Sequence, residues 1–130
     1  MTRHQMREAA FLLTFEQSFS NDSVDEIVSV AKECELFEMN DAAVKLFRGI
    51  VENRDHIDAI IQKHLKNWTI DRISKVSLAV LRVAIYEMRF CDEVSDDIAI
   101  SEAVILAQTY TLKDDVNFVN GVMASVNKDR

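Results

Sequence analysis

The chain contains no proline, and only two of its 130 residues are glycine. Proline and glycine end helices and form the tight turns between short strands, so their scarcity favours long helices over a β architecture. Apolar residues also recur at helical spacing, as in Phe11, Phe15 and Phe19, which follow one another at every fourth position. We therefore predict an all-α protein with about seven helices.

Capping patterns predict where the first helices begin. Ser23 and Glu26 have the three-residue spacing of a capping box, which would start a second helix after a first helix over 3–19. Asn40 or Asp41 would open a third helical region.

The most apolar stretch, 76–85, is predicted to be the buried central helix of the fold. Farther along, Asp114 or Asp115 would cap the last helix. Gly121 lies inside that last helix, where glycine costs roughly 1 kcal/mol relative to alanine. A neighbouring helix at short range would compensate for this cost, and so would a ligand against the backbone; of the two, we expect the neighbouring helix.

Length and composition predict one globular domain over 1–130, because a hydrophobic content of 48% suffices for a core without disulfides. The two cysteines, Cys34 and Cys91, match no zinc or redox spacing, which indicates a reducing compartment. No apolar run approaches 18 residues. We therefore expect a soluble, cytoplasmic protein without a membrane segment.

The net charge of −7 argues against strong binding of nucleic acid by electrostatics alone. The charges are nevertheless segregated along the chain. Residues 16–41 hold eight acids and one base and residues 92–115 hold seven acids and one base, whereas residues 45–89 hold nine bases and five acids. The basic stretch could form a local RNA surface that depends on a partner, or the charges could simply be solvated helix faces.

Nothing in the sequence indicates catalysis or a bound metal. His56 and His64 are eight residues apart, about two helical turns, which is too far for one helix to bring both to a single ion. The chain has no Glu-x-x-His pair, no Gly-rich phosphate loop and no nucleophile elbow. We predict a protein without enzymatic activity, catalytic residues, metal or cofactor.

Three blocks in the last third of the chain carry a family resemblance: LRVAIYE at 81–87, AISEA at 99–103 and FVNGV at 118–122. Together they resemble the NusB family of bacterial transcription antitermination proteins. The resemblance implies a compact fold of two packed helical subbundles. It also implies binding of single-stranded boxA RNA jointly with the ribosomal protein NusE. Such a protein, as a monomer or homodimer, would tether the transcript to RNA polymerase and support read-through of ribosomal RNA operons.

The same resemblance assigns RNA-binding roles to five residues. Arg3 and Arg7, four residues apart on one helix face, would contact phosphates. Phe15 and Phe118 would stack on unpaired bases, with Asp114 beside Phe118 on the same surface.

Glu87 is the residue that the resemblance places on the surface for NusE. It stands near the end of the central helix, where the helix dipole mildly disfavours a carboxylate. From the residues alone, an ion pair within the chain, with Arg82 or Arg89, is the alternative.

Two rival interpretations accompany this one. A NusB-like appendage of an RNA cytosine methyltransferase is not expected, because no catalytic domain follows Arg130. A helical protein-interaction scaffold with weak or lost RNA binding is the second rival. It is favoured by the depleted arginine motif at the N-terminus, where His4 stands in place of the family's second arginine.

Overall fold

In the computed structural model, which describes residues 1–129, the chain forms seven α-helices and one 3-10 turn. This confirms the all-α prediction. The elements are α1 (Arg3–Gln17), α2 (Val24–Glu33), α3 (Asp41–Glu52), α4 (Arg54–Lys63), η1 (Ile70–Arg72), α5 (Lys75–Phe90), α6 (Asp96–Tyr110) and α7 (Lys113–Lys128).

Side-chain caps set several of these helix starts. The capping box at α2 is confirmed: the Ser23 hydroxyl accepts a hydrogen bond from the Glu26 amide, and the Glu26 carboxylate accepts one from the Ser23 amide, both at 3.2 Å. Asn40 caps α3 by accepting from the Ala43 amide at 2.9 Å. These bonds satisfy amides that have no partner within the helix, so the sequence signals and the observed starts agree.

The capping role predicted for Asp114 or Asp115 is wrong. Helix α7 already begins at Lys113, and the preceding Leu112 makes no side-chain cap. Both aspartates instead lie within the first turn. Carboxylates are stabilised there by the positive end of the helix dipole, which explains why the acidic pair marks the helix start without capping it.

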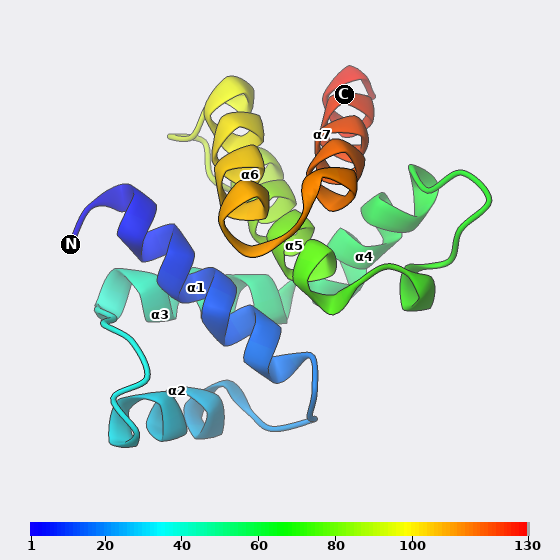
Figure 1. The fold of residues 1–130 in the computed structure, drawn as a ribbon. Coiled ribbons are helices and arrows are strands. Elements are labelled where there is room, and N and C mark those ends of the chain that lie inside the picture. Colours follow the sequence, from blue (N-terminus) through cyan, green and yellow to red (C-terminus); the bar gives the residue numbers. More distant parts are fainter. Residues whose placement is uncertain (130) are drawn as a thin grey trace.

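Helix α5 is the centre of the fold, as predicted for its apolar sequence. Eleven of its sixteen residues are buried, so almost every face of this helix meets a neighbour. It packs against α1, α3, α4, α6 and α7. Figure 1 shows α5 in the middle, with α6 and α7 side by side next to it and α1, α2 and α3 grouped on the other side.

Two apolar clusters correspond to the two predicted subbundles. The larger surrounds α5 and draws on every α-helix except α2. The smaller lies between α1, α2 and α3 and contains Leu13, Val24, Ile27, Val28, Ala31 and Phe47. Helices α1 and α3 contribute to both clusters and therefore join the subbundles.

The close helix contact expected at Gly121 occurs instead at the other glycine, Gly49. Gly121 is exposed, and a Cβ added to it would meet no atom within 4 Å, so the predicted close helix contact there is wrong. The close approach is at Gly49 on α3, where an added Cβ would collide with the Tyr86 hydroxyl and lie 2.5 Å from its Cζ. Gly49 faces α5, and only the absence of a side chain leaves room for the Tyr86 ring.

No helix within residues 1–129 is both long enough and apolar enough to cross a membrane.

Candidate nucleic-acid interface

The five predicted RNA-binding residues lie on two helices, three on α1 and two on α7. Arg3 and Arg7 lie in the first turns of α1, whereas Phe15 lies in its last turn. Twelve residues separate Arg3 from Phe15, which is about 18 Å along a helix. Asp114 and Phe118 are on α7, in a hollow that α1 does not line.

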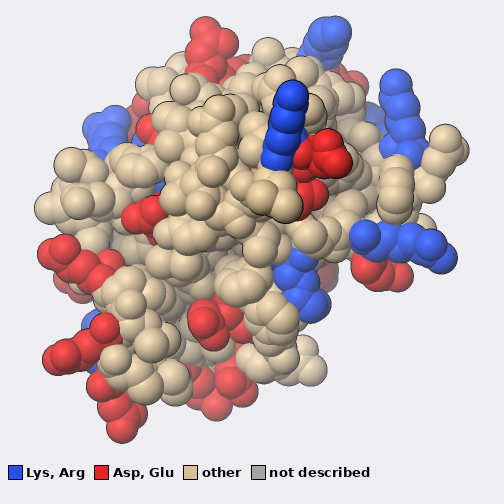
Figure 2. All heavy atoms as spheres, viewed as in Figure 1, with Lys and Arg blue, Asp and Glu red and all other residues tan. Residues whose placement is uncertain are grey.

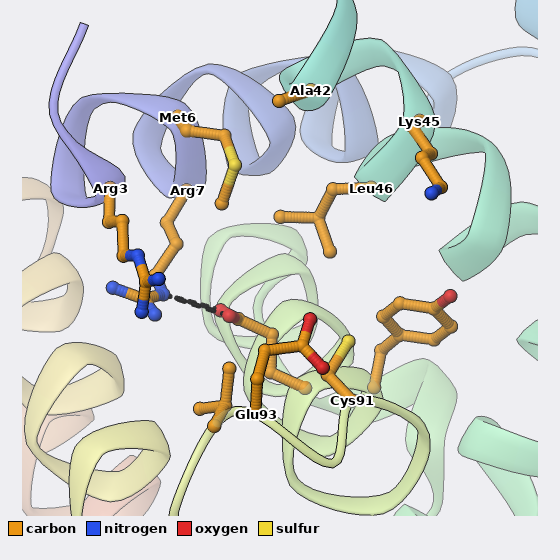
Figure 3. A pocket seen from close by; sticks show the side chains of 11 residues that line it. Arg3, Met6, Arg7, Ala42, Lys45, Leu46, Cys91 and Glu93 are labelled. Carbon is orange, nitrogen blue, oxygen red and sulfur yellow. Dashed lines mark hydrogen bonds and ion pairs between the residues drawn. The ribbon is translucent and has the colours of Figure 1, made fainter.

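Arg7 is not the exposed cation that we expected, because its side chain is only 5% exposed. Its Nε donates to both carboxylate oxygens of Glu87, at 2.7 and 2.9 Å (Figure 3). Its Nη1 also lies 3.6 Å from the Glu102 carboxylate on α6. The four-residue spacing does put Arg3 and Arg7 on one helix face, but α5 and α6 cover that face at Arg7 while Arg3 stays exposed.

Glu87 is likewise buried, with 3% exposure, so the prediction of an accessible carboxylate is wrong. Burial is the largest influence on the pKa of Glu87 and raises it, while the hydrogen bonds and charge of Arg7 lower it. An ion pair within the chain is thus present, but with a partner 80 residues away. Arg82 instead binds Asp58, at 2.8 and 2.9 Å, and Arg89 donates to the Val126 carbonyl oxygen at 3.2 Å.

A hollow of about 260 Å³ lies beside this ion pair, between the start of α1, α3 and the turn after α5 (Figure 3). Arg3 and Lys45 supply exposed cations at its border, and Glu93 supplies an exposed carboxylate. His4 ties the start of α1 to α6 through its Nδ1, which lies 2.8 Å from the Glu102 carboxylate. The first turn of α1 is therefore held in place by side chains from α5 and α6.

Cys91 borders the same hollow, and burial raises the pKa of its thiol to about 11, helped by the carboxylates of Glu87 and Glu93. Only about one in a thousand such thiols is ionised at pH 8, and the thiolate is the reactive form. Cys34 is exposed. We expect iodoacetamide at pH 8 to label Cys34 and leave Cys91 intact in the folded protein, and to label both in urea, as read by peptide mass spectrometry. Equal labelling rates without urea would contradict this burial of Cys91.

An aromatic row runs along α1 toward its C-terminal end. The ring centroid of Phe11 lies 4.9 Å from that of Tyr110 and 6.4 Å from that of Phe15, and Phe15 lies 4.9 Å from Phe19. Phe19 is 61% exposed, and the Lys75 ammonium lies 5.4 Å from its ring centroid. A base could therefore stack on an exposed ring next to a cation. The repeat of Phe11, Phe15 and Phe19 predicted a helix, but its spacing alone does not reveal that Phe19 lies at the surface.

Phe118 and Asp114 border a second hollow, of about 420 Å³, between the N-termini of α5 and α7. Trp68 and Arg72 also line it. Ser74, which also lines it, directly precedes the Lys75 that contacts Phe19, so this hollow adjoins the end of the aromatic row. The prediction that Asp114 lies beside Phe118 agrees with this geometry.

Charge is distributed unevenly over the surface. Figure 2 shows acidic side chains gathered over α2 and its flanking loops, as the acidic stretch 16–41 predicts. Within the described part of the chain, no three His, Cys, Asp or Glu side chains come together in a way that could hold a metal ion.

Comparison with known proteins identifies one family. The sequence profile of the NusB family matches residues 3–128. The transcription antitermination protein NusB of Listeria monocytogenes serotype 4a is 35% identical over 126 residues, which cover 97% of this chain and 96% of the relative. The NusB of Oceanobacillus iheyensis is 34% identical, covering 97% of this chain and 98% of the relative.

Solved structures give the same result. A structure of T. maritima NusB matches with a TM-score of 0.87 and 29% identity, covering 100% of this chain and 93% of that one. A structure of the antitermination factors NusB and NusE in complex with double-stranded RNA matches with a TM-score of 0.86 and 28% identity, covering 98% of this chain and 97% of that one.

Proposed function

The chain belongs to the NusB family of transcription antitermination proteins, and we propose that it binds single-stranded boxA-type RNA together with the ribosomal protein NusE. The observation that carries the proposal is the likeness, over 98% of the chain, to a NusB in complex with NusE and double-stranded RNA, which supports binding of RNA and NusE. In the bacterial cytoplasm, this assembly would tether the transcript to RNA polymerase and support read-through of ribosomal RNA operons. Its mechanism is assembly and not catalysis.

The RNA surface that we propose begins at Arg3 and continues over the far end of α1 to α7. Arg3 is an exposed cation that can contact a phosphate, and Lys75 is a second one beside the ring of Phe19. Phe15 and Phe118 are half-buried, so each presents part of a ring on which a base can stack. With few cations on this path, the protein alone should bind RNA weakly.

Arg7 and Glu87 have an indirect role in this proposal. Their ion pair fixes the start of α1 against α5, and it thereby positions the exposed Arg3 one turn earlier. For NusE binding, Glu87 would act in the same way, by holding the surface around it and not by touching the partner. Joint binding of RNA and NusE then lets two weak interactions combine through effective concentration.

A salt titration tests the RNA surface. With NusE present, Arg3→Ala should lower the salt slope of RNA binding by about 0.7, because one phosphate contact is lost. Phe118→Ala should instead weaken binding at every salt concentration, since stacking is worth on the order of 1–3 kcal/mol per base and depends little on salt. Fluorescence anisotropy of a labelled boxA-type RNA measures both.

Arg48→Ala is the matched control, because Arg48 is an exposed cation that pairs with Asp25 on the acidic side of the molecule. Its curve should follow that of the parent protein. Unchanged curves for Arg3→Ala and Phe118→Ala would place the RNA elsewhere. If NusE binds but no RNA does, the helical protein-interaction scaffold becomes the better interpretation.

A further inference from the structure

His4 holds the start of α1 to α6 with one of its two ring nitrogens. Its Nδ1 lies 2.8 Å from the Glu102 carboxylate, and its side chain is 39% exposed. An ionised carboxylate only accepts hydrogen bonds, so Nδ1 must carry a proton. The contact therefore fixes both the orientation of the ring and the tautomer of its neutral form.

The other ring nitrogen of His4, Nε2, has no hydrogen-bond partner within residues 1–129. In the neutral ring, with the proton on Nδ1, Nε2 carries a lone pair and can only accept a hydrogen bond. In the protonated ring, Nε2 is a donor and the ring has a positive charge. One proton therefore converts this nitrogen from a group that repels a phosphate oxygen into a group that binds it.

His4 lies on the side of α1 that carries the aromatic row. Positions 4, 8, 11 and 15 are spaced by three or four residues, which places them along one side of the helix. Helix α6 flanks this line, since Glu102 contacts His4 and the Tyr110 hydroxyl donates to the Glu8 carboxylate at 2.9 Å. An RNA strand that runs from the exposed Arg3 toward the aromatic row therefore passes His4 first.

We propose that His4 binds a phosphate of the RNA through Nε2, and that it does so only when its ring is protonated. The inference rests on the proposed function and adds a phosphate contact that depends on pH. A histidine ring loses its charge between about pH 5 and pH 8. Because the protonated form binds and the neutral form does not, RNA affinity should be highest at the acidic end of this range and should fall as the pH rises.

The charged groups around His4 come from three helices. They are Arg3, Arg7 and Glu8 on α1, Glu102 on α6, and Glu87 on α5, which joins the cluster through Arg7. The arginines stay charged throughout the pH range. Burial and the hydrogen bond to Glu8 raise the pKa of Tyr110 to about 12, so its hydroxyl stays neutral. Burial also raises the pKa of Glu87, so the experiment must distinguish a proton bound at Glu87 from one bound at His4.

RNA affinity at about pH 6 and about pH 8 tests the proposal. Fluorescence anisotropy of a labelled boxA-type RNA without a terminal phosphate measures it, with the full-length protein and NusE present. The parent protein should bind about tenfold more tightly at the lower pH, because one charge-assisted hydrogen bond is added. The salt slope of binding should also be steeper there by about 0.7, because one further phosphate is neutralised.

Three variants assign the proton to one side chain. His4→Asn keeps an N–H donor for Glu102 near the position of Nδ1 but lacks Nε2, so it should bind RNA at both pH values as weakly as the neutral parent. His4→Arg is charged at both pH values and should bind tightly at both. His56→Asn is the matched control, because His56 is an exposed histidine on α4, and it should retain the tenfold effect of pH.

The outcomes separate this inference from the proposed function. RNA binding whose pH effect persists in His4→Asn would assign the proton to another group, such as Glu87 or a side chain of NusE, and would overturn the role of His4. A pH effect of the same size on NusE binding without RNA, lost in His4→Asn, would assign His4 to the protein partner and overturn the phosphate contact. Both results leave the proposed function standing, whereas absence of RNA binding at both pH values would overturn it together with the inference.

Discussion

Replacement of Arg7 by alanine should lower the free energy of unfolding by about 3–5 kcal/mol, because it leaves the buried Glu87 carboxylate without its partner. Glu87→Ala should cost less, because Arg7 keeps the Glu102 carboxylate 3.6 Å from its Nη1. The side chains of Arg7 and Glu87 are at most 5% exposed, and two hydrogen bonds of 2.7 and 2.9 Å join them. Urea denaturation followed by circular dichroism measures the effect. The loss should exceed that of any single surface substitution in this chain.

Two control variants distinguish the loss of the buried Arg7–Glu87 ion pair from the loss of a charge elsewhere in the protein. Arg48→Ala removes an ion pair whose side chains are 45% and 84% exposed, and it should cost no more than about 1 kcal/mol. The double variant Arg7→Met/Glu87→Leu removes both charges and should recover most of the stability lost by either truncation. A double variant as unstable as the single ones would mean that packing, and not the uncompensated charge, dominates.

Replacement by alanine should change the free energy of unfolding in opposite directions at the two glycines. Gly49→Ala should destabilise by about 2 kcal/mol, because its new Cβ would overlap the Tyr86 ring and displace it from its stack on Phe90, where the ring centroids lie 5.3 Å apart. Gly121→Ala should stabilise by about 0.5–1 kcal/mol, because the site is open and alanine is the better helix former. Thermal and urea unfolding of the two variants give the comparison.

Tyr86→Leu provides the check on Gly49. If the Tyr86 ring is the obstacle, adding Gly49→Ala to Tyr86→Leu should cost far less than adding it to the parent protein. An equal loss of stability on Gly49→Ala in both backgrounds would show that Gly49 is needed for the backbone conformation of α3 and not for the contact with α5.

Because Glu87 is buried, its proposed role in NusE binding cannot be tested by a substitution at Glu87 itself. A charge reversal at this position would break the contact with Arg7 and lower stability, so weaker NusE binding by such a variant would not identify a contact. Exposed neighbours such as Glu93 report on the partner surface without this loss.

The sequence by itself determined the local structure of this protein. Helix starts at Ser23 and Asn40 were predictable because a cap is a contact between residues three apart. The buried centre at α5 was predictable because its sequence is apolar on nearly every face. The three sequence blocks at the C-terminal end also pointed to the family that the comparisons show.

Only the tertiary structure decided which of the singled-out residues are accessible. Helical spacing places Arg3 and Arg7 on one face, but it does not say that α5 and α6 cover that face at Arg7. The partner of Glu87 is 80 residues away, and no local pattern encodes a pairing at that distance. The hollow lined by Trp68 and Phe118 also depends on tertiary structure. Helix packing brings these two segments together, and no local sequence pattern predicts that they meet.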